Sequence, residues 1–163
     1  MLKHLRTISC RKIVFFIFSS SFKCFENNLS RGLVCFPWLR QMSVSNSVDV
    51  RASDLKLRAN QGESTPGVDI YSSEVEFVRC DIRGWTGGEW DYSASGSAGV
   101  RADEGSRVRI SLCEIEGGTG ADVWSEWKWI EPGDGAPAVH VRGGSEVVIT
   151  GDGTQVLQGG HGG

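Results

Sequence analysis

The 163-residue chain is poor in proline, histidine and methionine, with four, three and two residues respectively. It contains no Cys-x-x-Cys pair, and His4, His140 and His161 are scattered along the sequence. A protein metal site needs several such ligands at close spacing. No glycine-rich phosphate loop is present either, because none of the glycines precedes a predicted helix. We therefore expect neither a metal site nor a cofactor.

Long apolar runs and a basic stripe are absent too. The apolar run of residues 13–18 is far shorter than the roughly 20 residues of a membrane-spanning helix, so no membrane span is expected. Residues 1–41 carry seven Lys or Arg and one acidic residue, whereas residues 42–163 carry ten and nineteen. An acidic body of this kind argues against binding to a nucleic-acid backbone.

Residues 1–41 differ from the rest of the chain and hold a single glycine, Gly32. Basic residues precede the apolar run at 13–18 and small residues follow it, which is the pattern of a secretory signal peptide. On this interpretation the protein is secreted or held at the cell surface. The alternative is a mis-called start, with Met42 as the true beginning. In either case we expect an irregular or helical leader without a packed fold.

What the sequence does contain is glycine, at 22 residues, and an internal repeat. Four segments read Ser-x-apolar-x-apolar, and they begin at Ser53, Ser73, Ser106 and Ser145. Each serine is preceded by a pair of small or apolar residues two positions apart, and a small residue follows seven positions later. The preceding pairs are Val48/Val50, Val68/Ile70, Val100/Ala102 and Val139/Val141, and the following residues are Asn60, Cys80, Cys113 and Asp152.

Each copy of the repeat thus holds short pieces in which every second side chain is apolar, the pattern of half-buried β-strands. A single copy cannot bury its apolar face without a neighbour. The repeat therefore predicts an all-β protein, a right-handed parallel β-helix of about four coils. We place the β-helix domain at 42–163 and expect one interior column formed by equivalent residues of the four coils. The predicted coils lie near 47–64, 65–97, 98–137 and 138–163, and the predicted column is Leu55, Val75, Val108 and Val147.

The predicted stacking can be checked on outward residues, because equivalent side chains in successive coils become direct neighbours about 4.8 Å apart. Most of the charged neighbours have opposite signs, which favours the stacking. The attractive pairs are Lys56–Glu76, Glu76–Arg109, Glu74–Arg107 and Arg107–Glu146, and the one repulsive pair is Asp54–Glu74. No polar cap follows the fourth copy, so we expect further coils beyond the C-terminus or a partner on the open end.

The pattern Val-x-Ala-x-x-Gly-Ser-x-Val-x-Ile-x-x-Cys-x-Ile-x-Gly-Gly at 100–118 resembles the coil consensus of right-handed parallel β-helix proteins of the pectin-lyase-like superfamily. The Gly-Gly-Ser turn at 143–145 resembles large secreted or surface repeat proteins of bacteria. The resemblance covers about 47–160 and implies the fold. It also implies a ladder of small side chains inside the stack, at the positions of Asn60, Cys80, Cys113 and Asp152.

The same resemblance gives little support for catalysis. The paired-aspartate motifs of polygalacturonases are absent, and only the Gly-His-Gly at 160–162 matches a motif of those enzymes. Pectate lyases need several aspartates around calcium and an arginine base. The outward residues predicted for the first strand of each coil mix these types without clustering them, and they are Asp49, Asp69, Arg101 and His140. The sequence therefore points away from an enzyme without deciding the question.

Five of the six tryptophans lie in two insertions, at 85–97 and 118–137, which leave the predicted stack at the same corner. Aromatic faces beside carboxylates suit sugar binding, and Trp and Tyr also dominate protein-binding hot spots. The alternative is that these rings fold back and cover the flank of the stack. The candidate ligand-binding residues are Trp85, Trp90, Asp91, Tyr92, Trp124, Glu126, Trp127 and Trp129.

Of the five cysteines, Cys80 and Cys113 occupy the same slot of neighbouring coils. Their expected separation of about 4.8 Å permits a disulfide, but parallel Cβ vectors disfavour its dihedral angle. We expect two buried thiols that act as small apolar side chains.

The sequence-based hypothesis is a non-catalytic extracellular or cell-surface β-helix module. In this hypothesis the Trp-rich insertions bind a polysaccharide or a cell-surface protein. Two alternatives stay open. The chain can be a fragment of a polysaccharide lyase or glycoside hydrolase of the pectin-lyase-like superfamily, or a purely structural repeat spacer.

Overall fold

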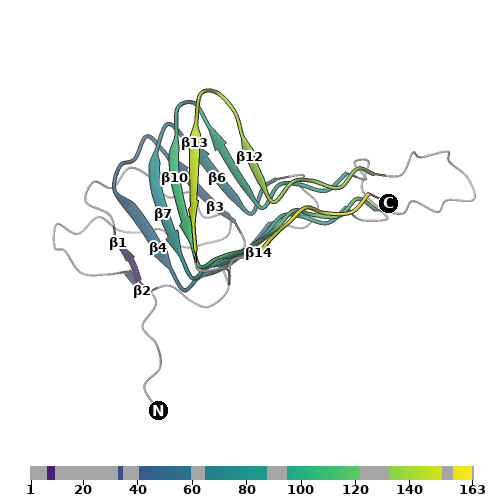
Figure 1. Ribbon diagram of the computed structural model, residues 1–163, viewed down its shortest axis with the longest axis horizontal. Helices are drawn as coiled ribbons and strands as arrows, with labels where there is room; N and C mark the ends of the chain where they lie inside the picture. The colour runs from purple at the N-terminus through teal and green to yellow at the C-terminus, as the bar shows by residue number, and fades with distance from the viewer. Residues whose placement is uncertain are drawn as a thin grey trace, which may run out of the picture.

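The computed structural model describes residues 7–9, 33–34, 41–59, 65–87, 95–121, 133–151 and 156–162. These residues form fourteen strands and no helix (Figure 1). The strands are β1 (Thr7–Ser9), β2 (Leu33–Val34), β3 (Met42–Ser45), β4 (Val50–Ser53), β5 (Lys56–Arg58), β6 (Val68–Tyr71), β7 (Glu74–Val78), β8 (Asp81–Arg83), β9 (Val100–Asp103), β10 (Arg107–Ser111), β11 (Glu114–Glu116), β12 (Val139–Val141), β13 (Glu146–Thr150) and β14 (Val156–Gln158).

Three parallel sheets run along the stack, and each takes one strand from every coil. The first sheet has the order β12-β9-β6-β3, the second contains β13-β10-β7-β4, and the third has the order β14-β11-β8-β5. Each coil therefore consists of three strands followed by a connection to the next coil, and Figure 1 shows the four coils nested one behind another. The predicted fold class is confirmed: the protein is an all-β parallel β-helix of four coils.

Alternation of side chains builds the core, as the period-two pattern predicts. In β10, Val108 and Ile110 point inward and are buried, while Arg107 and Arg109 are exposed. The same alternation holds in β6 and β9. One continuous core of buried residues runs through the first three coils and reaches Val147 in the fourth. Three of the four residues of the predicted column, Val75, Val108 and Val147, are register partners.

The prediction that Leu55 is the fourth member of that column is wrong. Val50 is the register partner of Val75, and the carbonyl of Leu55 accepts a hydrogen bond from the amide of Asp81, next to Cys80. The serine equivalent to Ser73 is Ser47, whose amide donates to the Ser73 hydroxyl at 3.1 Å. The first coil holds one more residue between this serine and the inward column, because Val50 follows Ser47 by three positions whereas Val75 follows Ser73 by two. Ser53 therefore fits the Ser-x-apolar-x-apolar frame and Ser47 does not.

The corrected register also moves the start of the first coil. It begins with β3, whose Met42 and Val44 are register partners of Val68 and Ile70, rather than at residue 47. The outward neighbours predicted for Lys56 and Asp54 are wrong for the same reason, because Lys56 lies beside Asp81 and Glu76 lies beside Arg51. The other three predicted neighbours are confirmed: Glu76–Arg109, Glu74–Arg107 and Arg107–Glu146.

The leader contributes two short strands and is not wholly irregular or helical. β1 pairs antiparallel with β4 on one side and with β2 on the other, so the second sheet has six strands. In the part of the chain that the structure describes, no helix is both long and apolar enough to cross a bilayer.

Candidate functional site

A two-layered extension projects from the corner where the third sheet meets the first (Figure 1). One layer contains the segments that leave the coils after β8, β11 and β14, and the other contains the segments that return to β9 and β12. We call this the glycine-packed extension. Its described segments are 84–87, 95–98, 117–121, 133–137 and 159–162.

Backbone hydrogen bonds zigzag between the two layers of the glycine-packed extension. The amide of Gly160 donates to Ala136, the amide of Ala136 to Gly118, and the amide of Gly118 to Ser97, at 2.8 to 2.9 Å. The series ends where the amide of Ser97 donates to the carbonyl of Trp85 at 2.9 Å. Main chain is thus packed directly on main chain, without a layer of side chains between.

Glycine is the residue that allows this close approach. A Cβ atom at Gly118 would overlap the carbonyl oxygen of Trp85, and one at Gly120 would overlap the carbonyl oxygen of Gly133. The same backbone overlap holds at five further glycines, which are Gly84, Gly96, Gly117, Gly135 and Gly160. The glycines of the coil consensus therefore bring the two layers together.

The extension places the bases of the two Trp-rich insertions side by side. Gly87 of the first insertion donates to the carbonyl of Thr119 in the second at 2.8 Å. On the returning layer, Gly96 donates to the carbonyl of Asp134 at 2.8 Å, and the Asp134 amide donates to the Ser95 hydroxyl. The two insertions thus leave the stack at one corner and as neighbours, as the sequence predicts.

Of the eight candidate ligand-binding residues, Trp85 alone lies in a described segment. Its side chain is only 6% exposed, and its backbone amide donates to the Ser97 hydroxyl at 2.7 Å. Trp85 is therefore placed to anchor the base of the first insertion, where it offers little face to a ligand. The other candidates lie outside the described residues, and they are Trp90, Asp91, Tyr92, Trp124, Glu126, Trp127 and Trp129.

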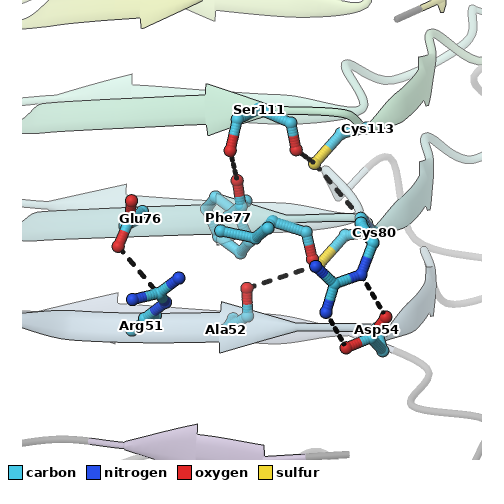
Figure 2. Close-up of polar contacts among 10 residues, drawn as sticks. Arg51, Ala52, Asp54, Glu76, Phe77, Cys80, Ser111 and Cys113 are labelled. Atoms are coloured by element: carbon cyan, nitrogen blue, oxygen red, sulfur yellow. Dashed lines mark hydrogen bonds and ion pairs between the residues drawn. The ribbon is translucent and has the colours of Figure 1, made fainter. Parts of the chain in front are cut away.

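A shallow hollow of about 310 Å³ lies on the outer face of the second sheet. Sequence reasoning missed it, because the outward residues of the first coil were assigned one strand too late. Arg51 and Glu76 form an ion pair across its floor at 3.4 Å, which Figure 2 shows. The residues that line it are Asp49, Val50, Arg51, Glu74, Val75, Glu76 and Arg109.

The outer face of the first sheet carries the predicted row of Asp69, Arg101 and His140 as register neighbours. Ser43 takes the place predicted for Asp49. Arg101 holds Asp69 with two hydrogen bonds, one of them at 2.9 Å from Nε to Oδ1. This contact raises the pKa of Arg101 above its usual value. An arginine held in this way stays charged and cannot accept a proton as a base.

The outer face of the third sheet is a network of ion pairs around Asp81. Arg58 contacts Asp81 with both terminal nitrogens, at 2.7 and 2.8 Å, and Arg83 lies between Asp81, Glu114 and Glu116 at 3.1 to 3.5 Å. Burial of Asp81 opposes its ionisation, but the hydrogen bonds and charges of Arg58 and Arg83 hold its pKa below the usual value. These carboxylates are therefore matched by arginines of the same face.

Cys80 and Cys113 are buried free thiols, as predicted. The amide of Cys80 donates to the sulfur of Cys113 at 3.3 Å, and the Cys80 thiol donates to the carbonyl of Ala52 (Figure 2). The interaction between the side chains of Cys80 and Cys113, together with burial, raises the pKa of the Cys80 thiol. The Cys80 thiol thus stays protonated and unreactive. The other predicted ladder residues, Asn60 and Asp152, lie outside the described residues. In the first coil, Leu55 occupies the position equivalent to Cys80, because its carbonyl accepts a hydrogen bond from Asp81 just as the carbonyl of Cys80 accepts one from Glu114.

Among the described segments, no group of three or more His, Cys, Asp or Glu side chains is arranged to hold a metal ion. The Gly-His-Gly at 160–162 lies in the glycine-packed extension, where the carbonyl of His161 accepts a hydrogen bond from Gly120 at 2.8 Å. Comparison with protein family models, with curated proteins and with solved structures gives no match.

Proposed function

We propose that this protein is a non-catalytic β-helix module, outside the cell or on its surface, that binds a carbohydrate or a protein through its two Trp-rich insertions. The observation that carries the proposal is the hydrogen bonding between the bases of the insertions, Gly87 to Thr119 and Gly96 to Asp134. Two loops that start as neighbours on a rigid base can form one binding surface. Aromatic rings and carboxylates, which these insertions contain, suit both sugars and protein hot spots.

The pairing of charges on the coils supports a non-catalytic role. Asp69 is bound by Arg101, Asp81 by Arg58, and Asp54 by Arg79. A general base or a calcium ligand needs a carboxylate that is available to a substrate or an ion. These three carboxylates are instead engaged in holding neighbouring coils together.

A glycan array tests the proposal. The parent chain should bind a subset of glycans, and the double variant Trp90→Ala/Trp127→Ala should lose that binding. Tyr71→Ala is the matched control, because Tyr71 is an aromatic side chain, 48% exposed, on the first sheet rather than in an insertion. Binding that survives in the double variant, or that is lost equally in Tyr71→Ala, contradicts the proposed site.

A polysaccharide lyase or glycoside hydrolase of the pectin-lyase-like superfamily is the second candidate. The hollow on the second sheet favours it, because Glu74, Glu76 and Asp49 line one concave surface with Arg51 and Arg109. Glycoside hydrolysis uses two carboxylates, and arginines suit an acidic sugar. Incubation with polygalacturonate and mixed glycans, with and without calcium, should yield new reducing ends or unsaturated products if this candidate is correct. Glu76→Gln should then abolish them.

A further inference from the structure

The two ends of the stack differ in how far their inward side chains are exposed. In the first coil, Met42, Val44, Val50 and Leu57 are 0 to 1% exposed, and β1 occupies the edge of β4. In the fourth coil, the inward side chains of Val141, Ile149 and Leu157 are 42 to 45% exposed. The end face formed by β12, β13 and β14 is thus an apolar surface bounded by three strand edges, and we call it the C-terminal end face.

The central outward residue of β13, Val148, is unlike its counterparts in the other coils. Val148 stands in register with Arg109, Glu76 and Arg51, so each of the three inner coils carries a charge where the last one carries valine. Val148 is 41% exposed. Edge strands that must stay unpaired usually carry charges that oppose association, and the edge strand of this face lacks one at its centre.

The geometry points to a second copy of this chain as the occupant: we propose that two copies pair through their C-terminal end faces, with β13 antiparallel to β13 about a two-fold axis at Val148. The edge of β13 suits this arrangement. The amide of Glu146 donates to the carbonyl of Ser106 in the coil below. Because backbone groups of alternate residues point to opposite sides, those of Val147 and Ile149 point to the open side.

A two-fold axis at Val148 sets Val147 of one copy opposite Ile149 of the other, as a hydrogen-bonded antiparallel pair on each side of the axis. Val148 of one copy then faces Val148 of the other as a non-hydrogen-bonded pair, and Glu146 of one copy faces Thr150 of the other. No two like charges face each other. The same arrangement on β10 or β7 would set Arg109 against Arg109 or Glu76 against Glu76, which is repulsive.

The rest of the face is compatible with the same axis. In Figure 1, β12 and β14 leave opposite ends of β13 and converge on the extension, so a two-fold rotation that exchanges the ends of β13 lays β12 over β14. Val139 and Val141 of one copy then lie over Leu157 of the other. A self-complementary surface of this kind is what a two-fold dimer requires.

Head-to-tail stacking is the alternative arrangement of two copies. It would need an open first coil, whereas the inward side chains of that coil are buried.

Sedimentation velocity of the full chain tests the dimer. The parent should sediment as a species of twice the 17.7 kDa chain mass, with monomer appearing on dilution. Val148→Arg should be monomeric, because it places two arginines against each other at the axis. Val48→Arg is the matched control: Val48 is 49% exposed in the first coil, so this variant should remain dimeric. A monomeric parent at submillimolar concentration, or filaments in place of dimers, overturns the proposal.

A cross-link tests the axis without relying on a disruptive change. Val148→Cys, with Cys10, Cys24 and Cys35 replaced by serine, should form a disulfide-linked dimer on mild oxidation. Non-hydrogen-bonded antiparallel partners have Cα atoms about 4.5 Å apart, which lies within the span of a disulfide. Val48→Cys in the same background should give no such dimer. Equal cross-linking of the two variants, or none at Val148→Cys, contradicts the proposed axis.

Discussion

The backbone amide of Ser73 donates a hydrogen bond of 3.2 Å to the hydroxyl of Ser106, which lies 33 residues later in the chain. Ser47 donates to Ser73 in the same way at 3.1 Å, and Ser106 donates to Ser145 at 3.0 Å. Each coil thus satisfies a corner amide with a hydroxyl of the next coil. This serine ladder shows why serine recurs at one point of the repeat: the corner amide is buried and needs an acceptor.

Ser106→Ala is expected to destabilise the protein through the amide of Ser73. Ser106 is fully buried, and its removal leaves that amide without an acceptor, which costs about 2 kcal/mol in the free energy of unfolding. Urea denaturation followed by circular dichroism measures the effect. Ser43→Ala, at a half-exposed outward position of β3, should change the midpoint little. Equal effects of the two changes would show that the hydroxyl of Ser106 is not what matters.

Val108→Asp should prevent folding. Val108 is 1% exposed and stands in the inward column between Val75 and Val147, so the change places a carboxylate in an apolar core without a partner. The cost is several kcal/mol, of the same order as the whole stability of a small domain. The β signal in circular dichroism should disappear.

Leu112→Asp is the control for that experiment. Leu112 is 40% exposed, and its φ of 54° lies in the left-handed region, which aspartate adopts more readily than leucine. The control should fold normally. A folded Val108→Asp would contradict the assignment of inward and outward positions in β10.

Much of this fold follows from the sequence because a period of two directly encodes which side chains point inward. The columns through Val75, Val108 and Val147 and the buried pair Cys80 and Cys113 were predictable in this way. The first coil was not, because its inward Val50 follows the ladder serine Ser47 by three residues instead of two, so the repeat frame selects Ser53 in its place.

The candidate sites were less accessible to sequence reasoning. The position of the insertions followed from the glycines that end each coil, but the packing of Gly118 against Trp85 depends on contacts between backbones, which no side-chain pattern records. The hollow beside Arg51 and Glu76 needed the correct register of the first coil, so it could not be found before that register was known.

Gly118→Ala should disrupt the glycine-packed extension. A Cβ at this position would overlap the carbonyl of Trp85, and the backbone of the two layers would have to separate. We expect a loss of about 3 kcal/mol or more, seen as a lower urea midpoint. Gly159→Ala is the matched control, because a Cβ there has only one ordinary contact, 3.7 Å from the carbonyl oxygen of Ala136. If Gly118→Ala is as stable as Gly159→Ala, the two layers are not held in direct backbone contact.

Asp81→Asn should lower stability in a way that depends on pH. The pKa of Asp81 in the folded protein is held below its usual value by Arg58 and Arg83, against the effect of burial. A depressed folded pKa contributes stability above the unfolded pKa of about 3.9, and this contribution is lost as the pH falls through the folded pKa. Because the arginines are partly exposed, we expect a difference of about 1 kcal/mol at neutral pH.

The measurement is the free energy of unfolding of parent and Asp81→Asn, from urea titrations between neutral pH and strongly acidic pH. The two curves should converge as the pH falls below the unfolded pKa. Glu104→Gln removes a carboxylate from an exposed turn and should leave the pH dependence of the parent unchanged. A difference between parent and Asp81→Asn that stays constant across the acidic range would mean that the ion pairs of Asp81 with Arg58 and Arg83 do not stabilise the stack.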